Sequence, residues 1–332
     1  MKVKIMTLIF STLLFASCSN DVKNPLLDKW DTPFETPPFD LIEDNHYLPA
    51  FYDAMKLHNA EIDAIANNSE VPTFDNTIGA IENSGAMLTR VSRIFSAMNG
   101  AMNNDKIKAV SKEIYPKLSE HFDKINMNNA LFKKIKTLYD KKDELSLTNE
   151  QIVVLTNHYK QFIRGGANLN DEDKTKFSKI NSQLSSLSIQ FGENVLTETN
   201  SFELVVDSKN DLDGLSESII ANAAETASSS GHEGKWVFTI QKPSLLPFIQ
   251  YSTKRDLREK IYSAYFMKGD KNNDLDNKNI AVQMANLRLE KAKLLGFNSH
   301  AAFVLDEQMA KNPENVNVLL QKVWNPAIKK AK

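Results

Sequence analysis

The chain has a single cysteine, Cys18, among its 332 residues, so no internal disulfide can form. Its fold must therefore depend on a hydrophobic core, even in an oxidising compartment. An excess of charge of one sign is also missing, because 40 Lys and Arg residues oppose 42 Asp and Glu residues. The resulting net charge of −2 gives no basis for nucleic-acid binding, and we predict no such partner.

The signatures of several enzyme classes are absent as well. The sequence has no Gly-x-Ser-x-Gly turn of a serine hydrolase and no phosphate-binding Walker loop. A zinc hydrolase needs two histidines about one helical turn apart, and no histidine here has another within five positions. We therefore predict no catalytic residue and no metal ligand in this chain. The histidines are His46, His58, His121, His158, His232 and His300.

Some of these histidines have predictable surroundings. His58 lies on the apolar stripe of its predicted helix, which favours a core histidine over a metal ligand. His121 and His158 lie on predicted helices, and we interpret both as surface or boundary residues. His232 precedes Glu233 in a segment rich in Gly and Ser, where no second histidine follows.

Residues 1–18 have the pattern of an export signal. Lys2 and Lys4 supply a positive start, and Ile5–Phe15 form an apolar core that is too short to span a bilayer. Small residues precede Cys18, as expected where a signal peptidase cuts before a cysteine that is then acylated. We predict a lipoprotein with Cys18 as its lipidation site, and an ordinary secretory signal is the alternative.

Acyl chains on Cys18 would attach the protein to a membrane. We therefore predict a lipid-anchored protein of the bacterial cell envelope, on the periplasmic side of a membrane. Residues 19–48 are predicted to form a tether and then a proline-rich arm, since proline biases the chain away from helix. The apolar residues of this arm are expected to pack onto the body; they are Trp30, Phe34, Phe39 and Leu41.

Residues 49–200 are predicted to form a helical domain, because apolar residues recur every three or four positions. Thr148 and Gln151 have the spacing of a capping box and predict the start of one helix. Another helix is predicted to begin near Asn170 and to run for about 28 residues, or roughly 42 Å. A helix of that length usually organises a domain.

Two short β-rich runs, Phe202–Val206 and Lys235–Ile240, predict a small hairpin or sheet within residues 201–251. A helix is expected between them, over Leu215–Ala227. Residues 252–332 return to the helical pattern. Asn312 and Pro313 there predict the start of a last helix, with an N-cap followed by proline at the first helical position.

Several segments of the chain resemble one family. LREKIYSAY (257–265), LRLEKAKLLGF (287–297) and MAKNPENV (309–316) are similar to the thimet-type zinc metallopeptidases of family M3. The opening TPFETPPFDLIEDNHYLPAF (32–51) resembles the peptidyl-dipeptidase Dcp branch more than the oligopeptidase A branch.

The resemblance implies a mostly α fold, with a neurolysin- or thimet-like body of many helices and a small β insertion. It also implies a zinc-dependent peptidyl-dipeptidase that cleaves short peptides in a deep channel and is a monomer at full length. Those enzymes carry their His-Glu-x-x-His motif beyond the region matched here. We therefore expect an N-terminal portion, truncated before the catalytic zinc domain, that binds no zinc and is inactive alone. The alternative is a non-catalytic helical lipoprotein that binds peptides or acts as a scaffold.

Overall fold

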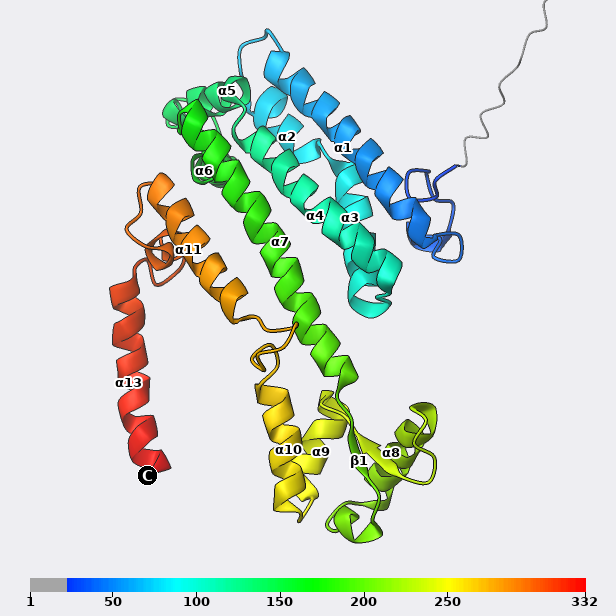
Figure 1. Cartoon of the computed structure of the whole chain (residues 1–332). Helices are drawn as coiled ribbons and strands as arrows, with labels where there is room; N and C mark the ends of the chain where they lie inside the picture. The colour runs from blue at the N-terminus through cyan, green and yellow to red at the C-terminus, as the bar shows by residue number, and fades with distance from the viewer. Residues whose placement is uncertain (1–22) are drawn as a thin grey trace, which may run out of the picture.

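The computed structural model describes residues 23–332, which fold into a mostly helical body with one small antiparallel sheet (Figure 1). The predicted signal and lipidation site, residues 1–18 with Cys18, lie outside the described residues. Within residues 23–332, no helix has both the length and the apolar character needed to cross a membrane.

The first six helices form one end of the molecule. They are α1 (Asp44–Asn67), α2 (Ala80–Asn83), α3 (Ala86–Ala101), α4 (Asp105–Asn126), α5 (Asn129–Asp140) and α6 (Asn149–Arg164). Two apolar clusters hold this end together. One lies among α1, α3 and α4 and includes Phe51 and Phe95, whose ring centres are 5.4 Å apart. The other joins the end of α1 to α5 and α6, with the ring of Phe132 stacked on that of Phe162.

The long helix α7 (Asp171–Ser201) organises the rest of the fold. It begins at Asn170, whose side chain accepts a hydrogen bond from the Asp173 amide, and acidic residues fill its first turn. It extends for 31 residues, close to the predicted length. It packs along α4 on one side and α11 (Lys278–Leu294) on the other (Figure 1).

The end of α7 leads into a small α/β unit. Strands β1 (Leu204–Val206) and β2 (Trp236–Phe238) pair antiparallel, with Val205 opposite Val237, as the β-rich runs predicted. Three helices complete the unit: α8 (Glu217–Ser229), α9 (Lys242–Tyr251) and α10 (Arg255–Phe266). Their apolar faces enclose a separate core around Phe238 and Phe248.

A loop between α10 and α11 is fastened to α7 by buried polar contacts. The Glu198 carboxylate, 3% exposed, accepts hydrogen bonds from the Gly269 amide and the Asn273 side chain, each at 2.9 Å. Asn194 of α7 donates to the Asn277 side chain, also at 2.9 Å. These contacts fix where the chain turns back along α7.

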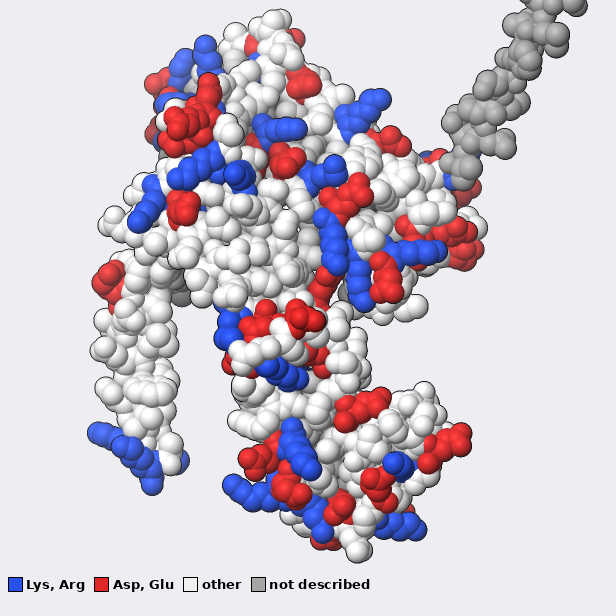
Figure 2. All heavy atoms as spheres, viewed as in Figure 1, with Lys and Arg blue, Asp and Glu red and all other residues white. Residues whose placement is uncertain are grey.

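The chain ends in α12 (His300–Leu305) and α13 (Pro313–Ala331). As predicted, Asn312 caps α13, by accepting a hydrogen bond from the Asn315 amide, and Pro313 occupies the first turn. Charged residues of both signs are scattered over the body, whereas most of α13 is uncharged on the face in view (Figure 2). Its large apolar side chains are 54–65% exposed; they are Val318, Leu319, Leu320, Val323 and Trp324.

The prediction for the proline-rich arm is wrong for most of its apolar residues. Phe34 is 98% exposed, Phe39 51% and Leu41 59%, so none of them packs onto the body. The arm is held by Leu26, which is fully buried, and by Trp30, which stacks under the Arg90 guanidinium at 4.5 Å. Pro38 is buried as well, and Ile42 packs against the apolar cluster of α1, α3 and α4.

Candidate functional site

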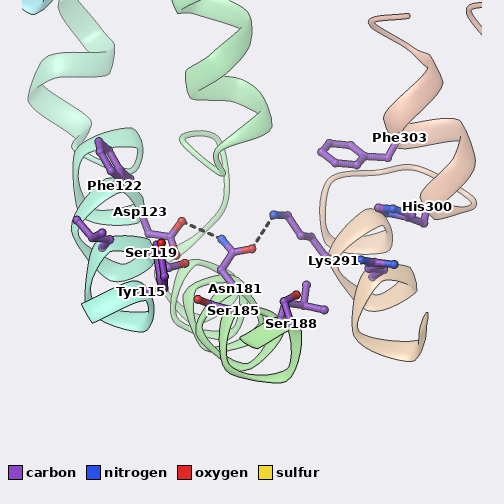
Figure 3. A pocket seen from close by; sticks show the side chains of 13 residues that line it. Tyr115, Ser119, Phe122, Asp123, Asn181, Ser185, Ser188, Lys291, His300 and Phe303 are labelled. Carbon is purple, nitrogen blue, oxygen red and sulfur yellow. Dashed lines mark hydrogen bonds between the residues drawn. The ribbon is translucent and has the colours of Figure 1, made fainter. Parts of the chain in front are cut away.

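A pocket of about 580 Å³ opens where α4, α7, α11 and α12 meet (Figure 3). Asp123 and Phe122 extend from α4, Asn181 rises from α7, and His300 and Phe303 face them from α12. Its walls therefore come from segments that lie far apart in the sequence.

A chain of polar groups crosses the pocket. The Asn181 side-chain amide donates to Asp123 Oδ1 at 2.8 Å, and the Lys291 ammonium donates to Asn181 Oδ1 at 2.6 Å. Asn181 thus links an acid on α4 to a base on α11 (Figure 3). The amide can do this because it has both a donor and an acceptor.

Burial shifts the pKa of both charged groups in this hydrogen-bonded series, Asp123 and Lys291. It raises the pKa of Asp123, against the hydrogen bond from Asn181, the nearby Ser178 hydroxyl and the charge of Lys291. It lowers the pKa of Lys291, against the charge of Asp123. The attraction between the two groups therefore opposes the effect of burial on each pKa, and losing either would leave an uncompensated charge.

The α11–α12 side of the pocket is cationic. Arg288, Lys291 and His300 all line it. Burial and the positive charges of Arg288 and Lys291 together lower the pKa of His300. Within residues 23–332, His300 Nδ1 is buried and has no hydrogen-bond partner.

Arg164 of α6 fastens this side of the pocket to the body. It donates to the Phe303 carbonyl oxygen at 2.7 Å, pairs with Asp306 at 3.3 Å and lies 4.1 Å from the centre of the Phe303 ring. A second pair, Lys160 with Glu307 at 3.0 Å, lies beside it. The segment after α11 is therefore held against α6.

The histidines that the sequence singled out lie elsewhere. His58 is buried, as predicted, but the prediction for His121 and His158 is wrong, because they are only 4% and 9% exposed. His58 Nδ1 faces His121 Nε2 at 2.9 Å, and His158 pairs with Glu82 at 2.6 Å. The helical period favoured Phe122 over its neighbour His121 as the buried residue, but Phe122 is 46% exposed, and the packing of α1 on α4 brings His58 and His121 together.

These residues do not fit a zinc ion. The two imidazoles of the His58–His121 pair bond to each other instead of converging on a shared point. Across residues 23–332, no group of three His, Cys, Asp or Glu side chains is arranged to hold a metal. His232, in its loop, pairs with Glu203 at 3.0 Å.

Comparison with known proteins gives a consistent picture. Residues 248–332 match the model of peptidase family M3. The chain is 35% identical over 88% of its length to the dipeptidyl carboxypeptidase of Escherichia coli (strain K12). It is 30% identical over 92% of its length to an organellar oligopeptidase A of Arabidopsis thaliana. The chain belongs to peptidase family M3. The expected mostly α fold with a small sheet is confirmed for this member of the family.

This M3 chain spans less than half the length of these relatives, 43% of the E. coli protein and 39% of the Arabidopsis one. The region that matches the family model contains the cationic side of the pocket, including Arg288 and His300. The opposite side, with Asp123 and Asn181, precedes that region. Sequence reasoning missed the pocket because no short-range pattern joins residues of α4, α7 and α11.

Proposed function

We propose that the chain is the N-terminal portion of a zinc-dependent peptidyl-dipeptidase that removes dipeptides from the carboxyl end of short peptides. One observation carries this proposal. The similarity to dipeptidyl carboxypeptidases extends over almost the whole chain, at 35% identity for the E. coli protein and 32% for the Salmonella typhimurium protein. The oligopeptidase A of E. coli is 29% identical over the same share of the chain.

In this proposal the chain builds one wall of a peptide channel and supports the catalytic portion. The exposed apolar face of α13 is consistent with that role. Val323 and Trp324 are 60% and 65% exposed, and residues of this size are normally covered. We propose that the remaining part of the peptidase packs on this face.

The chemistry would come from residues outside this chain. None of the described side chains fits a zinc site, so no step of hydrolysis is assigned to them. A zinc ion in the whole enzyme would supply an activated water for attack on the peptide bond. The isolated chain is expected to be inactive.

Lipid attachment at Cys18 is a separate part of the proposal and rests on the sequence of residues 1–18. It would place the peptidase in the cell envelope, where it would act on exported or imported peptides. Mass spectrometry of the N-terminal peptide from membranes tests it. An acylated Cys18 supports the anchor, whereas a cleaved, unmodified N-terminus contradicts it.

The decisive experiment begins with the DNA beyond the codon for Lys332. We expect an in-frame continuation that encodes His-Glu-x-x-His. The protein expressed from the whole frame should release dipeptides from an N-blocked tripeptide, and a zinc chelator should abolish that activity. A stop codon after Lys332, or dipeptide release by the 332-residue chain itself, would overturn the proposal. The first result would favour a non-catalytic peptide-binding or scaffold lipoprotein.

A further inference from the structure

The proline-rich arm presents three large apolar side chains to solvent. Phe34 is 98% exposed, Phe39 51% and Leu41 59%. All three lie in one surface segment at the start of α1, drawn in dark blue in Figure 1. Single exposed apolar residues are common on soluble proteins, but a group of them marks a contact with another protein or with a membrane.

The backbone of the arm holds Phe34 outward. Phe34 has a left-handed φ of +58°, and Glu35 follows with +52°. This region is unfavourable for residues with a Cβ, and such outliers cluster at binding and active sites. The Glu35 amide donates to the Thr32 carbonyl oxygen at 3.0 Å, which closes the turn, and Pro38 is buried after it. The exposure of Phe34 is therefore fixed by the turn that carries it.

The start of the arm is fastened to the body. Asn24 donates to the His46 carbonyl oxygen at 2.8 Å, and Arg90 donates to that of Leu26 at 2.6 Å. The proposed lipidation site, Cys18, precedes Asn24 by six positions. Because a chain extends by at most about 3.5 Å per residue, Asn24 would lie within about 21 Å of Cys18, which its acyl chains would hold at the membrane surface. This short link gives the arm a high effective concentration at the bilayer.

The arm and α13 lie on opposite sides of the body (Figure 1). The remaining part of the peptidase is proposed to pack on α13, so that contact is centred away from the arm. Charge restricts the partner further, because exposed acids outnumber exposed lysines in the arm and do not attract anionic headgroups. The acids are Asp28, Asp31, Glu35 and Asp40, and the lysines are Lys23 and Lys29.

We propose that Phe34, Phe39 and Leu41 insert into the interfacial layer of the bilayer in which Cys18 is anchored. The partner is a phospholipid surface of low net charge. Apolar side chains leave water at this layer without spanning the membrane, and a second contact strengthens a lipid anchor. The N-terminal end of α1 would then lie against the membrane, with α13 on the far side of the body. This inference rests on the lipid attachment in the proposed function.

Site-specific fluorescence in vesicles tests the contact. Cys18 is the only cysteine, so a cysteine introduced elsewhere is the only free thiol once Cys18 is acylated. Glu35→Cys places a fluorophore beside the intact Phe34. Glu70→Cys places one beyond the other end of α1, a helix of 24 residues or about 36 Å. Each acylated chain is purified from membranes and reconstituted into phosphatidylcholine vesicles that contain a nitroxide-labelled lipid.

We expect the labelled lipid to quench the Glu35→Cys fluorophore at least threefold more strongly than the Glu70→Cys fluorophore. Equal quenching would overturn the inference. Shielding of the Glu35→Cys fluorophore from aqueous iodide without quenching by lipid would overturn it too, because a protein surface would then cover the arm. Stronger quenching after half of the lipid is replaced by phosphatidylglycerol would show attraction to charged headgroups, which contradicts a surface of low charge.

A matched pair of substitutions tests the apolar side chains themselves. With the fluorophore on Glu35→Cys, Phe34→Ser should lower the quenching by lipid at least twofold. Val71→Ser removes an apolar side chain that is 80% exposed beyond the far end of α1, and it should leave the quenching unchanged. No effect of Phe34→Ser would mean that the acyl chains alone bring the arm to the lipid, and would refute the insertion.

The mass of the N-terminal peptide from the same preparation reports acylation separately. An acylated Cys18 with equal quenching of the two fluorophores would refute the contact of the arm and leave the anchor standing. An unmodified Cys18 would refute the anchor and the contact together. Dipeptide release by the whole enzyme is measured independently of both.

Discussion

The buried His58–His121 pair makes the stability of the chain depend on pH in a way that can be measured. The rings lie 5.0 Å apart, with His121 Nε2 at 2.9 Å from His58 Nδ1. One ring must donate and the other accept, so the neutral pair is satisfied. Protonating both would set two donors against each other in a buried site.

The size of the effect follows from His121. Burial, with the positive charges of His58 and Lys124, lowers its pKa from 6.5 to about 4. Between these values the unfolded chain binds more protons than the folded one, so the free energy of unfolding decreases as the pH falls. The difference corresponds to at most about 3 kcal/mol, lost progressively from about pH 6.5 to about pH 4. Burial also lowers the pKa of His58, while the charge of Glu61 opposes that shift.

Urea unfolding at several pH values between 4 and 7 measures this dependence. His121→Gln keeps a hydrogen-bonding group toward His58 but cannot take up a proton in this range. Between pH 7 and pH 4, the free energy of unfolding should decrease by at least about 1 kcal/mol less in the variant than in the wild type. Carboxylates common to the two proteins cancel in the comparison. Identical slopes for wild type and His121→Gln would refute the reasoning.

Three further changes test how the fold is held. Gly85→Ala should destabilise the chain by about 2–4 kcal/mol in urea unfolding, because φ at Gly85 is +68° and the new Cβ would lie 2.9 Å from the His58 ring. Thr148→Ala removes the capping-box partner of Gln151 and should cost about 1 kcal/mol, whereas Thr137→Ala on α5 should cost less. Glu198→Ala leaves two donors of the α10–α11 loop unpaired and should lower the free energy of unfolding by about 2–3 kcal/mol. The Gly269 amide should then exchange its hydrogen faster. Unchanged exchange at Gly269 would contradict the role of this carboxylate in holding the loop.

Burial works to raise the pKa of Glu198, but hydrogen bonds from Asn273 and Gly269 and the charge of Lys271 lower it below its usual value. The carboxylate therefore remains ionised in the folded chain. This explains why the loop is fastened at neutral pH, and why the contact should weaken only under acidic conditions.

Local patterns in the sequence determined most of the helices. The capping box at Thr148 and the long run after Asn170 predicted where α6 and α7 begin, since these signals involve residues within one turn of each other. The two β-rich runs likewise predicted β1 and β2. The family resemblance was recognisable for the same reason, because it is carried by contiguous segments.

Only the tertiary structure decided the surroundings of the polar residues. The sequence predicted His121 to lie at a helix surface, and the packing of α4 on α1 buries it against His58. It predicted Phe34 to pack onto the body, but its side chain is 98% exposed. The pocket joins Asp123, Asn181 and Lys291 across three helices. Helical periodicity fixes which side of a helix is apolar, but the partner of a polar group depends on contacts between residues far apart in the chain, and only the folded chain brings those together.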